Sequence, residues 1–299
     1  MAYHYRHSIC NEVYEKWDFA AACASIKKAG YDGIEIAPFT LHEYPATIPP
    51  AQRNEYRRII ADAGLEFVGL HWLMVSPKGL HVTTPDAALR AQSWRHIRDL
   101  VDLCADLAGN RADDNGGRGG SSPKDSASRN GIMVFGSPKQ RTSTGGITPA
   151  EATRHFVDGL AGVTPHAEQR GVTILVEALP KADSDIINTV AAAAEIVREI
   201  GSPNVRTMFD THNAADETEP HAAVLERYFD LIRHIHINEM DGRHPGAGDY
   251  DFRPIFETLA RRNYSGWVSL EVFDFSAGAE AIANDSLRYV EKVLSGMTT

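Results

Sequence analysis

The amino-acid sequence predicts a single α/β domain with the (β/α)8, or TIM barrel, architecture, and three observations lead to this prediction. The chain has 299 residues, somewhat more than the ~250 that are typical of one such barrel. Short runs rich in β-branched residues alternate with longer amphipathic runs along the chain. No GxGxxG turn follows the first strand candidate, which argues against a dinucleotide-binding sheet. Because alternating β and α units imply parallel strands with helical crossovers, eight such units favour a closed barrel.

The elements can be followed in order along the chain. The strand candidates are the short apolar runs at 5–9, 33–38, 66–72, 132–136, 173–178, 205–210, 232–237 and 267–273. The helical patterns that follow them begin near Asp18, Pro50, Thr84, Thr148, Asn188, Glu219, Arg253 and Gly278. Two of these starts carry explicit signals, because Thr84 and Thr148 each precede a proline as an N-cap residue precedes a proline at N1. Glu151 at N3 completes a capping box in the second.

One segment interrupts this alternation. Residues 110–130 read NRADDNGGRGGSSPKDSASRN and contain no large apolar side chain. Such a segment cannot bury enough surface to offset the entropy of ordering it. We therefore expect a flexible Gly/Ser/Asp-rich insertion within one domain spanning 1–299, on the barrel face opposite the usual catalytic face.

Composition excludes several classes of protein. The formal net charge is −10, from 30 basic and 40 acidic residues, which argues against a nucleic-acid partner. No apolar run reaches the length of a membrane span, and the N-terminus lacks the layout of a signal peptide. Cys10, Cys23 and Cys104 are scattered and odd in number, as in a reduced cytoplasmic protein. The sequence leaves a homo-oligomer open.

Candidate ligands recur where the last four strands end. The segments TILVEALP, VRTMFDTHN, IRHIHIN and WVSLEVF supply Glu177, Asp210, His236 and Glu271. A carboxylate in an apolar strand is costly unless it is paired or bound to a metal. Three carboxylates and one imidazole form a mixed shell that favours Mn²⁺, with Mg²⁺ or Co²⁺ as alternatives, over a structural zinc site. An internal polar network without a metal is the alternative interpretation.

Other polar residues lie on the strands, or in the loops that follow them, toward the same end of the predicted barrel. The substrate-binding candidates are Glu35, His71, Lys139, Arg141, Asp183, His212, Asn213 and Arg243. Lys139 and Arg141 are expected to contact an anionic group, and Trp72 is expected to form a wall of the pocket. Arg243 lies in the loop HIHINEMDGRHPGAGDYDF, whose PGAG segment predicts a tight turn and whose Asp251 is expected to cap the next helix.

Together these motifs resemble the sugar phosphate isomerase/epimerase family, which has the xylose isomerase-like barrel. The resemblance spans nearly the whole chain outside 110–130, and its most specific pieces are LVEALP, MFDTHN, HIHINEMDGRHPGAGDYDF and WVSLEVF. It implies that Glu177, Asp210, His236 and Glu271 bind the metal. The family's ketose 3-epimerases further imply that Glu177 and Glu271 are catalytic.

The match to the ketose 3-epimerases is incomplete. Asp183 corresponds to their acid six residues past the first glutamate, and Arg243 corresponds approximately to their arginine after the metal histidine. Those enzymes place a histidine three residues past the metal aspartate, whereas this chain has Asn213 there, with His212 next to it. The family also contains hydroxypyruvate isomerase-like enzymes, inosose and dehydroshikimate dehydratases, C-glycoside-cleaving enzymes and, more distantly, apurinic endonucleases.

The function expected from the sequence is therefore a divalent-metal-dependent isomerase or epimerase. Its substrate is expected to be a small carbohydrate, a sugar phosphate or a keto-acid, with proton transfer through an enediolate that the metal stabilises. The main alternative is a metal-dependent lyase or dehydratase on a keto-sugar or keto-cyclitol, with His71 or His212 as an extra general acid. An endonuclease for abasic DNA and a sugar-binding barrel without catalysis are weaker alternatives.

Overall fold

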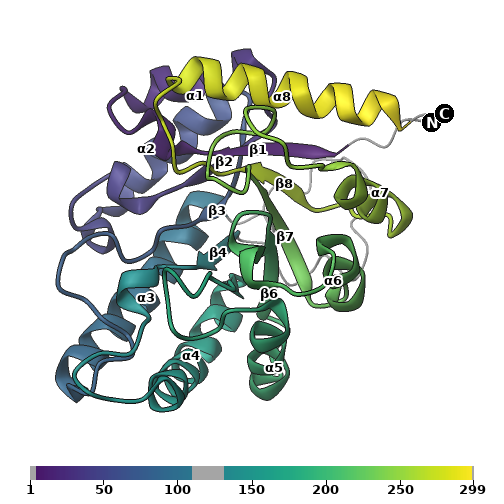
Figure 1. Ribbon diagram of the computed structural model, residues 1–299. Helices are drawn as coiled ribbons and strands as arrows, with labels where there is room; N and C mark the ends of the chain where they lie inside the picture. The colour runs from purple at the N-terminus through teal and green to yellow at the C-terminus, as the bar shows by residue number, and fades with distance from the viewer. Residues whose placement is uncertain (1–4, 110–130, 298–299) are drawn as a thin grey trace.

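The computed structural model describes residues 5–109 and 131–297 and shows a closed barrel of parallel strands surrounded by helices (Figure 1). The strands are β1 (Arg6–Cys10), β2 (Gly33–Ile36), β3 (Glu66–Leu70), β4 (Ile132–Phe135), β5 (Thr173–Val176), β6 (Val205–Asp210), β7 (Ile232–Ile237) and β8 (Trp267–Leu270). The helices are α1 (Phe19–Ala29), α2 (Pro50–Asp62), α3 (Ala87–Ala108), α4 (Pro149–Arg170), α5 (Val190–Ile200), α6 (His221–Tyr228), α7 (Arg253–Arg261) and α8 (Ala279–Gly296). The predicted barrel is confirmed, and the insertion expected at 110–130 lies outside the described residues.

Each strand pairs with its neighbours in chain order, and β8 closes the barrel onto β1 through the pairs Arg6↔Trp267 to Ile9↔Leu270. Because all pairs are parallel, every strand ends at the same mouth of the barrel. On β6 and β7, Asp210 lies directly opposite His236. This register brings two of the predicted ligands together.

The interior of the barrel follows the two-residue alternation of β-strands. A buried apolar cluster contains Val134 on β4, Leu175 on β5 and Met208 on β6, with Val68 and Ile132. Successive side chains on a strand point to opposite faces, so residues two positions further on return to the interior. Glu177 and Asp210 are each two residues beyond a member of this cluster. The apolar layer therefore fixes the direction in which these carboxylates point.

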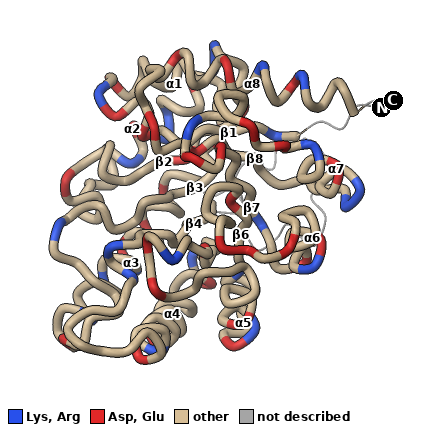
Figure 2. The backbone as a smooth tube through the Cα atoms, in the orientation of Figure 1, with Lys and Arg blue, Asp and Glu red and all other residues tan. Residues whose placement is uncertain are grey.

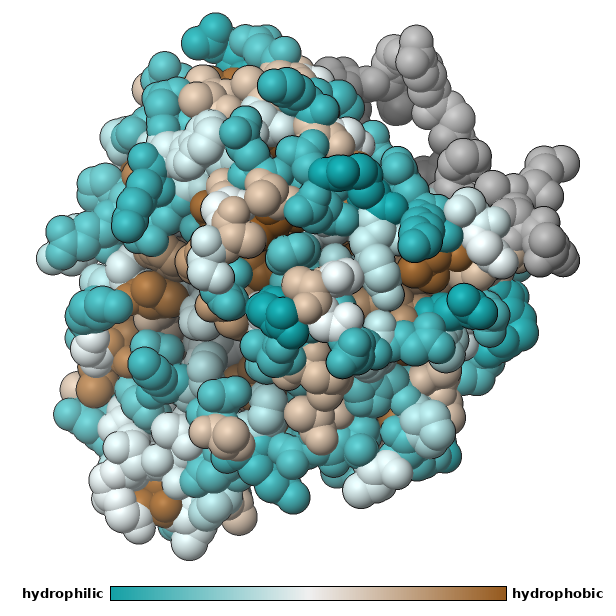
Figure 3. Space-filling model, turned by 45° about the horizontal axis from the view of Figure 1, so that its top comes forward, coloured by the Kyte–Doolittle hydropathy of each residue, from teal (hydrophilic) through white to brown (hydrophobic). Residues whose placement is uncertain are grey.

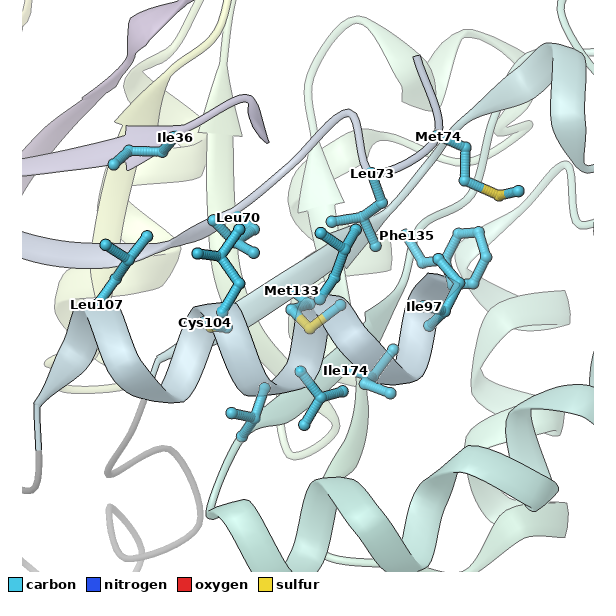
Figure 4. Close-up of a cluster of buried hydrophobic side chains, with 14 of the residues drawn as sticks. Ile36, Leu70, Leu73, Met74, Ile97, Cys104, Leu107, Met133, Phe135 and Ile174 are labelled. Atoms are coloured by element: carbon cyan, nitrogen blue, oxygen red, sulfur yellow. The ribbon is translucent and has the colours of Figure 1, made fainter. Parts of the chain in front are cut away.

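A second apolar layer lies between the strands and the outer helices. Figure 4 shows this layer where Ile97, Cys104 and Leu107 of α3 face Leu70 of β3 and Met133 of β4. All of these side chains are buried. Removing a buried Leu side chain of this kind typically costs 2–5 kcal/mol, so this layer is a main source of stability for the strands.

Several helices begin at a residue whose side chain caps the first turn. Thr148 and Glu151 form the predicted capping box at α4, and Asp18 caps α1 by accepting a hydrogen bond from the amide of Ala21. The predicted start of α3 at Thr84 is wrong, because the carboxylate of Asp86 accepts from the amides of Ala88 and Leu89 and makes Asp86 the N-cap. The carboxylate directly after the Thr-Pro pair offered a stronger cap than the threonine hydroxyl.

The end of α7 nearest the predicted site differs slightly from the expectation. Phe252 is the N-cap residue, and Asp251 accepts a hydrogen bond from the amide of Arg253 at 3.0 Å. Asp251 thus binds the amide of the first helical residue, although it lies one residue before the N-cap position.

Several strands end earlier than the apolar pattern predicted. β2, β3, β5 and β8 stop two or three residues before the expected ends at 38, 72, 178 and 273. His71, Glu177 and Glu271 therefore stand immediately after their strands, where the chain leaves the barrel wall. The apolar runs continue past these points because the following residues pack against other segments, as Val272 and Leu179 are buried.

The outer surface is polar and mixed in charge. Acidic and basic residues are interspersed over the helices in Figure 2, and the face in Figure 3 is largely hydrophilic with scattered apolar patches. Within the described residues, no helix combines the length and the hydropathy that a membrane span requires.

Candidate metal centre and pocket

Four predicted ligands converge at the mouth of the barrel. Glu177, Asp210, His236 and Glu271 each offer a ligand atom, and these atoms all lie within 4.8 Å of one another. All four side chains are buried. These residues come from four consecutive strands of the barrel, β5 to β8. The cluster therefore follows directly from parallel pairing and strand register.

Neighbouring amides orient two of the carboxylates. Asn213 donates from its side chain to Glu177 Oε1 at 2.9 Å and from its backbone to Asp210 Oδ1 at 2.7 Å. Asn238 donates from Nδ2 to Asp210 Oδ2 at 3.2 Å. Asn213 and Asn238 lie just after β6 and β7, so each strand supplies both a potential ligand and a donor for a neighbouring carboxylate.

The imidazole of His236 is enclosed by carboxylates. Its Nδ1 lies 2.9 Å from Glu271 Oε2 and 3.5 Å from Asp210 Oδ2. Its Nε2 lies 3.1 Å from Glu35 Oε1, on the opposite side of the ring. Outer carboxylates of this kind commonly fix the orientation of a histidine that binds a metal.

Glu35 is completely buried inside the barrel. It also lies 2.8 Å from Nε2 of His234, two residues before His236 on β7. Burial raises the pKa of Glu35, but the imidazoles of His234 and His236 more than reverse this effect and hold the pKa well below its usual value. Glu35 therefore remains ionised beneath the four-ligand cluster.

The electrostatics of the cluster favour a cation. Burial, with the neighbouring carboxylates Glu271 and Asp210, raises the pKa of Glu177 to about 8. Burial also raises the pKa of Glu271, although contact with His236 partly offsets the increase. Crowded carboxylates repel one another, and a divalent cation among them would remove this repulsion. The donor set of three carboxylates and one imidazole therefore fits such an ion.

A cavity of about 250 Å³ opens beside this cluster. Its polar lining comprises His71, Ser137, Glu177, Asp183, His212, Asn213 and Glu271. Its apolar lining comprises Trp72, Val134, Gly136, Pro138, Leu179 and Phe273. A separate, larger cleft of about 1040 Å³ lies between α2 and α3 and is lined by none of the four clustered ligands.

Aromatic rings form one wall of this pocket. Phe273 lies edge-on to Trp72, with ring centroids 6.1 Å apart, and it contacts His212 at 4.8 Å. His212 Nδ1 lies 2.8 Å from the carbonyl oxygen of Met240, which fixes the ring at the pocket edge. The expectation that Trp72 forms a wall agrees with this arrangement.

The loop after β7 is organised around a buried carboxylate. Glu239 accepts hydrogen bonds from the amides of Gly246 and Tyr250, at 2.8 and 2.9 Å. Gly246 has φ +89°, a value that L side chains rarely adopt, so the predicted PGAG turn depends on glycine here. Glu239 therefore has a structural role that the sequence pattern did not indicate.

Four of the predicted substrate contacts lie outside the pocket lining. Lys139 is exposed, and Arg243 forms a surface ion pair with Asp241 at 2.7 Å. Arg141 is completely buried and donates from Nη1 to the carbonyl oxygen of Phe135 at 2.7 Å. Arg141 was expected to contact an anionic group, but its side chain turns inward beside β4 and does not line the cavity. Glu35 contacts histidines, not the cavity.

Sequence reasoning missed three buried polar residues next to the cluster, namely Cys10, Glu12 and His234. The His-Ile-His alternation on β7 was the signal for His234, because it places both imidazoles on the interior face. Cys10 ends β1 and Glu12 lies two residues beyond it, where the apolar pattern gave no reason to single them out. His71 lines the cavity, and its Nε2 lies 2.7 Å from Glu12 Oε2.

The fold and the site together define a class of protein, a (β/α)8 barrel whose mouth carries buried carboxylate and imidazole ligands beside a small polar cavity. The chain belongs to the xylose isomerase-like TIM barrel family, whose model matches residues 23–293.

Relatives with similar sequences include sugar epimerases. The chain is 25% identical over 280 residues to D-psicose 3-epimerase of Agrobacterium fabrum, covering 91% of this chain and 86% of that protein. It is also 25% identical over 250 residues to L-ribulose 3-epimerase of Mesorhizobium japonicum, covering 84% and 74%. A putative hydroxypyruvate isomerase of Streptomyces coelicolor is 30% identical over 133 residues, covering 42% of this chain and 48% of that protein.

Solved structures share the whole architecture. A crystal structure of D-psicose 3-epimerase in the presence of D-fructose superposes with a TM-score of 0.78 at 20% identity, covering 97% of this chain and all (100%) of that one. The apo form of a 3-keto-D-glucoside 4-epimerase from E. coli gives 0.77 at 20% identity, with the same coverage of both chains. At this level of identity the similarity establishes the fold.

Proposed function

We propose that the protein is a divalent-metal-dependent isomerase or epimerase of a small carbohydrate. The observation that carries this proposal is the convergence of Glu177, Asp210, His236 and Glu271 within 4.8 Å at the edge of a polar cavity. The sugar epimerases among the relatives support the same reaction class. Mn²⁺ is the ion that best suits the donor set, with Mg²⁺ or Co²⁺ as alternatives.

The proposed chemistry is proton transfer at a carbon next to a carbonyl group. When bound, the cation would act as a Lewis acid toward the oxygens of the substrate. Glu177 and Glu271 both line the cavity, and they come from β5 and β8, with two strands between them. One carboxylate would remove the proton and the other would return it, from a different direction in an epimerisation. Positioned acid–base groups of this kind typically contribute about 10²–10⁴-fold each.

Other pocket residues would bind and enclose the substrate. Asp183 and Asn213 offer groups that hydrogen-bond sugar hydroxyls, and Trp72 and Phe273 offer apolar surface for the C–H face of a sugar. In the described part of the chain, the cavity lining includes no lysine or arginine that could hold a phosphate, because it lacks Lys139, Arg141 and Arg243. The substrate class that best fits the lining is an uncharged keto-sugar or keto-glycoside.

The decisive experiment is solvent-deuterium uptake followed by NMR. The purified protein, stripped of metal and resupplied with Mn²⁺, is incubated in D₂O with ketoses, keto-glycosides, inososes, keto-acids and their phosphates. We expect a metal-dependent label at one sugar C–H, which Glu177→Gln and Glu271→Gln each abolish. Glu291→Gln, at an exposed position on α8, is the matched control. Full exchange in Glu177→Gln would refute the role in proton transfer proposed for Glu177.

A lyase is the second candidate, and the position of His212 favours it. Because Nδ1–H of His212 donates to the carbonyl oxygen of Met240, the neutral ring presents an unprotonated Nε2 at the pocket edge, which would take up a proton from the substrate and then deliver it to a leaving group. The same carboxylates could then eliminate water or another leaving group from a keto-sugar. An ultraviolet-absorbing enone product that disappears in His212→Gln would favour the lyase. Reversible interconversion of two sugars would favour the isomerase or epimerase.

A further inference from the structure

A second group of ligand-type side chains adjoins the four-ligand cluster. Cys10, Glu12, His71 and Glu271 are all buried, and each offers a ligand atom within 4.8 Å of the others. Glu271 belongs to both groups. Because β8 pairs with β7 on one side and β1 on the other, the two groups adjoin each other across the Glu271 carboxylate.

The contacts in this second group are incomplete. Glu12 Oε2 lies 2.7 Å from His71 Nε2, whereas Glu12 Oε1 is buried with no hydrogen-bond partner among the described residues. His71 Nδ1 is also buried without a hydrogen bond in this part of the chain, with Glu35 Oε1 3.8 Å away. A buried carboxylate oxygen without a partner is costly. A cation at this position would satisfy it.

Cys10 adds a different chemistry to this group. It is a free, buried cysteine at the end of β1, and its Sγ lies 3.8 Å from Ser269 Oγ and 4.0 Å from His236 Nε2. Its buried position close to two imidazoles and three carboxylates differs from that of Cys23 and Cys104, which lie among apolar side chains of the core. A thiol among such groups can lose its proton to a metal ion and bind it as a thiolate.

We propose that Cys10, Glu12, His71 and Glu271 form a second divalent-cation site that shares Glu271 with the first. Sulfur and nitrogen donors together with carboxylates suit Zn²⁺ or Co²⁺, whereas the first set, with three carboxylates and one imidazole, suits Mn²⁺. Binding would release the Cys10 proton to solvent. The negative charges of the thiolate and the two carboxylates would then compensate the positive charge of the ion.

Sharing Glu271 has a functional consequence that depends on the proposed function. A carboxylate that bridges two ions has no oxygen left to carry a proton. Occupation of the second site by Zn²⁺ would therefore inhibit proton transfer by Glu271 while the first site keeps its ion. Inhibition by Zn²⁺ at saturating Mn²⁺ that weakens in Cys10→Ser is the expected result.

The binding test does not depend on turnover. The metal-free full-length protein is titrated with Co²⁺, and near-ultraviolet absorption is recorded together with bound cobalt per chain. We expect a thiolate-to-cobalt charge-transfer band and more than one equivalent of cobalt. Cys10→Ser should lose the band and one equivalent, whereas Cys23→Ser, a matched buried cysteine in α1, should keep both.

Two further variants separate this proposal from the first site. Asp210→Asn should lose an equivalent of cobalt and keep the band, because Asp210 belongs only to the first group. Glu12→Gln should raise the cobalt concentration needed to produce half of the charge-transfer band, without changing the circular dichroism spectrum. A wild-type protein without the band, or a band that persists in Cys10→Ser, would overturn the second site and leave the first untouched.

Discussion

The side-chain amide of Asn213 donates a hydrogen bond to Glu177 Oε1 at 2.9 Å, while its backbone amide donates to Asp210 at 2.7 Å. One residue therefore links the carboxylate that follows β5, Glu177, to the carboxylate that ends the neighbouring strand β6, Asp210. This position carries a histidine in the ketose 3-epimerases that the sequence resembles. An asparagine here can donate to Glu177 without adding an ionisable group to a crowded acidic site.

Replacing Asn213 with alanine should reduce the proposed proton transfer. The variant keeps the backbone contact to Asp210 and loses the donor that orients Glu177. A hydrogen bond to a charged group contributes about 1.5–3 kcal/mol, which corresponds to roughly 10- to 100-fold in kcat/KM. Steady-state kinetics, or the rate of deuterium uptake, provide the measurement. Asn54→Ala, at an exposed position on α2, is the control, and equal rates in both variants would contradict the role assigned to Asn213.

A single methyl group added at Gly136 should damage the site selectively. A Cβ at this position would meet Glu177 Oε2 at 2.2 Å, so the carboxylate must move away. We expect Gly136→Ala to weaken Mn²⁺ binding roughly tenfold or more, as disturbed ligand orientation commonly does. Isothermal titration calorimetry measures this change, and circular dichroism should show an unchanged fold.

The matched control is Gly162→Ala on α4. Nothing lies within 4 Å of a Cβ at that position, so the substitution should leave metal binding unchanged. Because alanine is a better helix former than glycine, it should also raise the free energy of unfolding by up to about 1 kcal/mol. Equal metal affinities in the two variants would show that Gly136 does not protect Glu177.

Glu35 should influence metal affinity without touching the ion. In Glu35→Gln the fully buried carboxylate that faces His234 and His236 becomes a neutral amide. Loss of such an outer partner typically weakens metal binding about 10- to 100-fold. The dissociation constant for Mn²⁺ is the measurement, with the exposed Glu55→Gln as reference. An unchanged constant would mean that His236 is oriented by other contacts.

Acid pH should destabilise the barrel through His7 on β1. Burial lowers the pKa of His7 from 6.5 to about 4, with a partial opposing effect from Asp32. The folded state therefore binds this proton more weakly than the unfolded chain does. Its contribution to stability is complete above about pH 6.5 and is lost as the pH falls toward about 4, by at most roughly 3 kcal/mol. Urea unfolding across this range should show a smaller loss for His7→Gln than for the wild type, and parallel curves would contradict the prediction.

The sequence was sufficient to predict the barrel because its signals are repetitive. Each strand is a short apolar run, each helix is amphipathic, and parallel pairing in chain order follows from their alternation. The boundaries were harder, as the ends of β3 and β8 show. Apolar residues beyond a strand end pack just as well as those within it, so hydropathy does not mark where the backbone leaves the sheet.

The four converging side chains were also predictable, whereas the surroundings were not. Glu177 and Asp210 stand out because a carboxylate in an apolar strand requires a partner. Cys10 and Glu12 look ordinary in the sequence, and only the closure of β8 onto β1 brings them next to Glu271. Arg141 was expected to contact an anionic group because its segment GSPKQR follows the fourth strand on the active face. Nothing local indicates that its side chain turns toward the carbonyl of Phe135.

The contact between Glu35 and His236 joins β2 to β7 through the interior of the barrel. The ligand groups come from the later strands and the supporting carboxylate from an early one, so neither half of the chain can assemble the centre alone. An ion that binds only the folded barrel would add its binding free energy to the free energy of folding. Depletion of that metal would therefore destabilise the folded protein and shorten its lifetime in the cell, in addition to abolishing its activity.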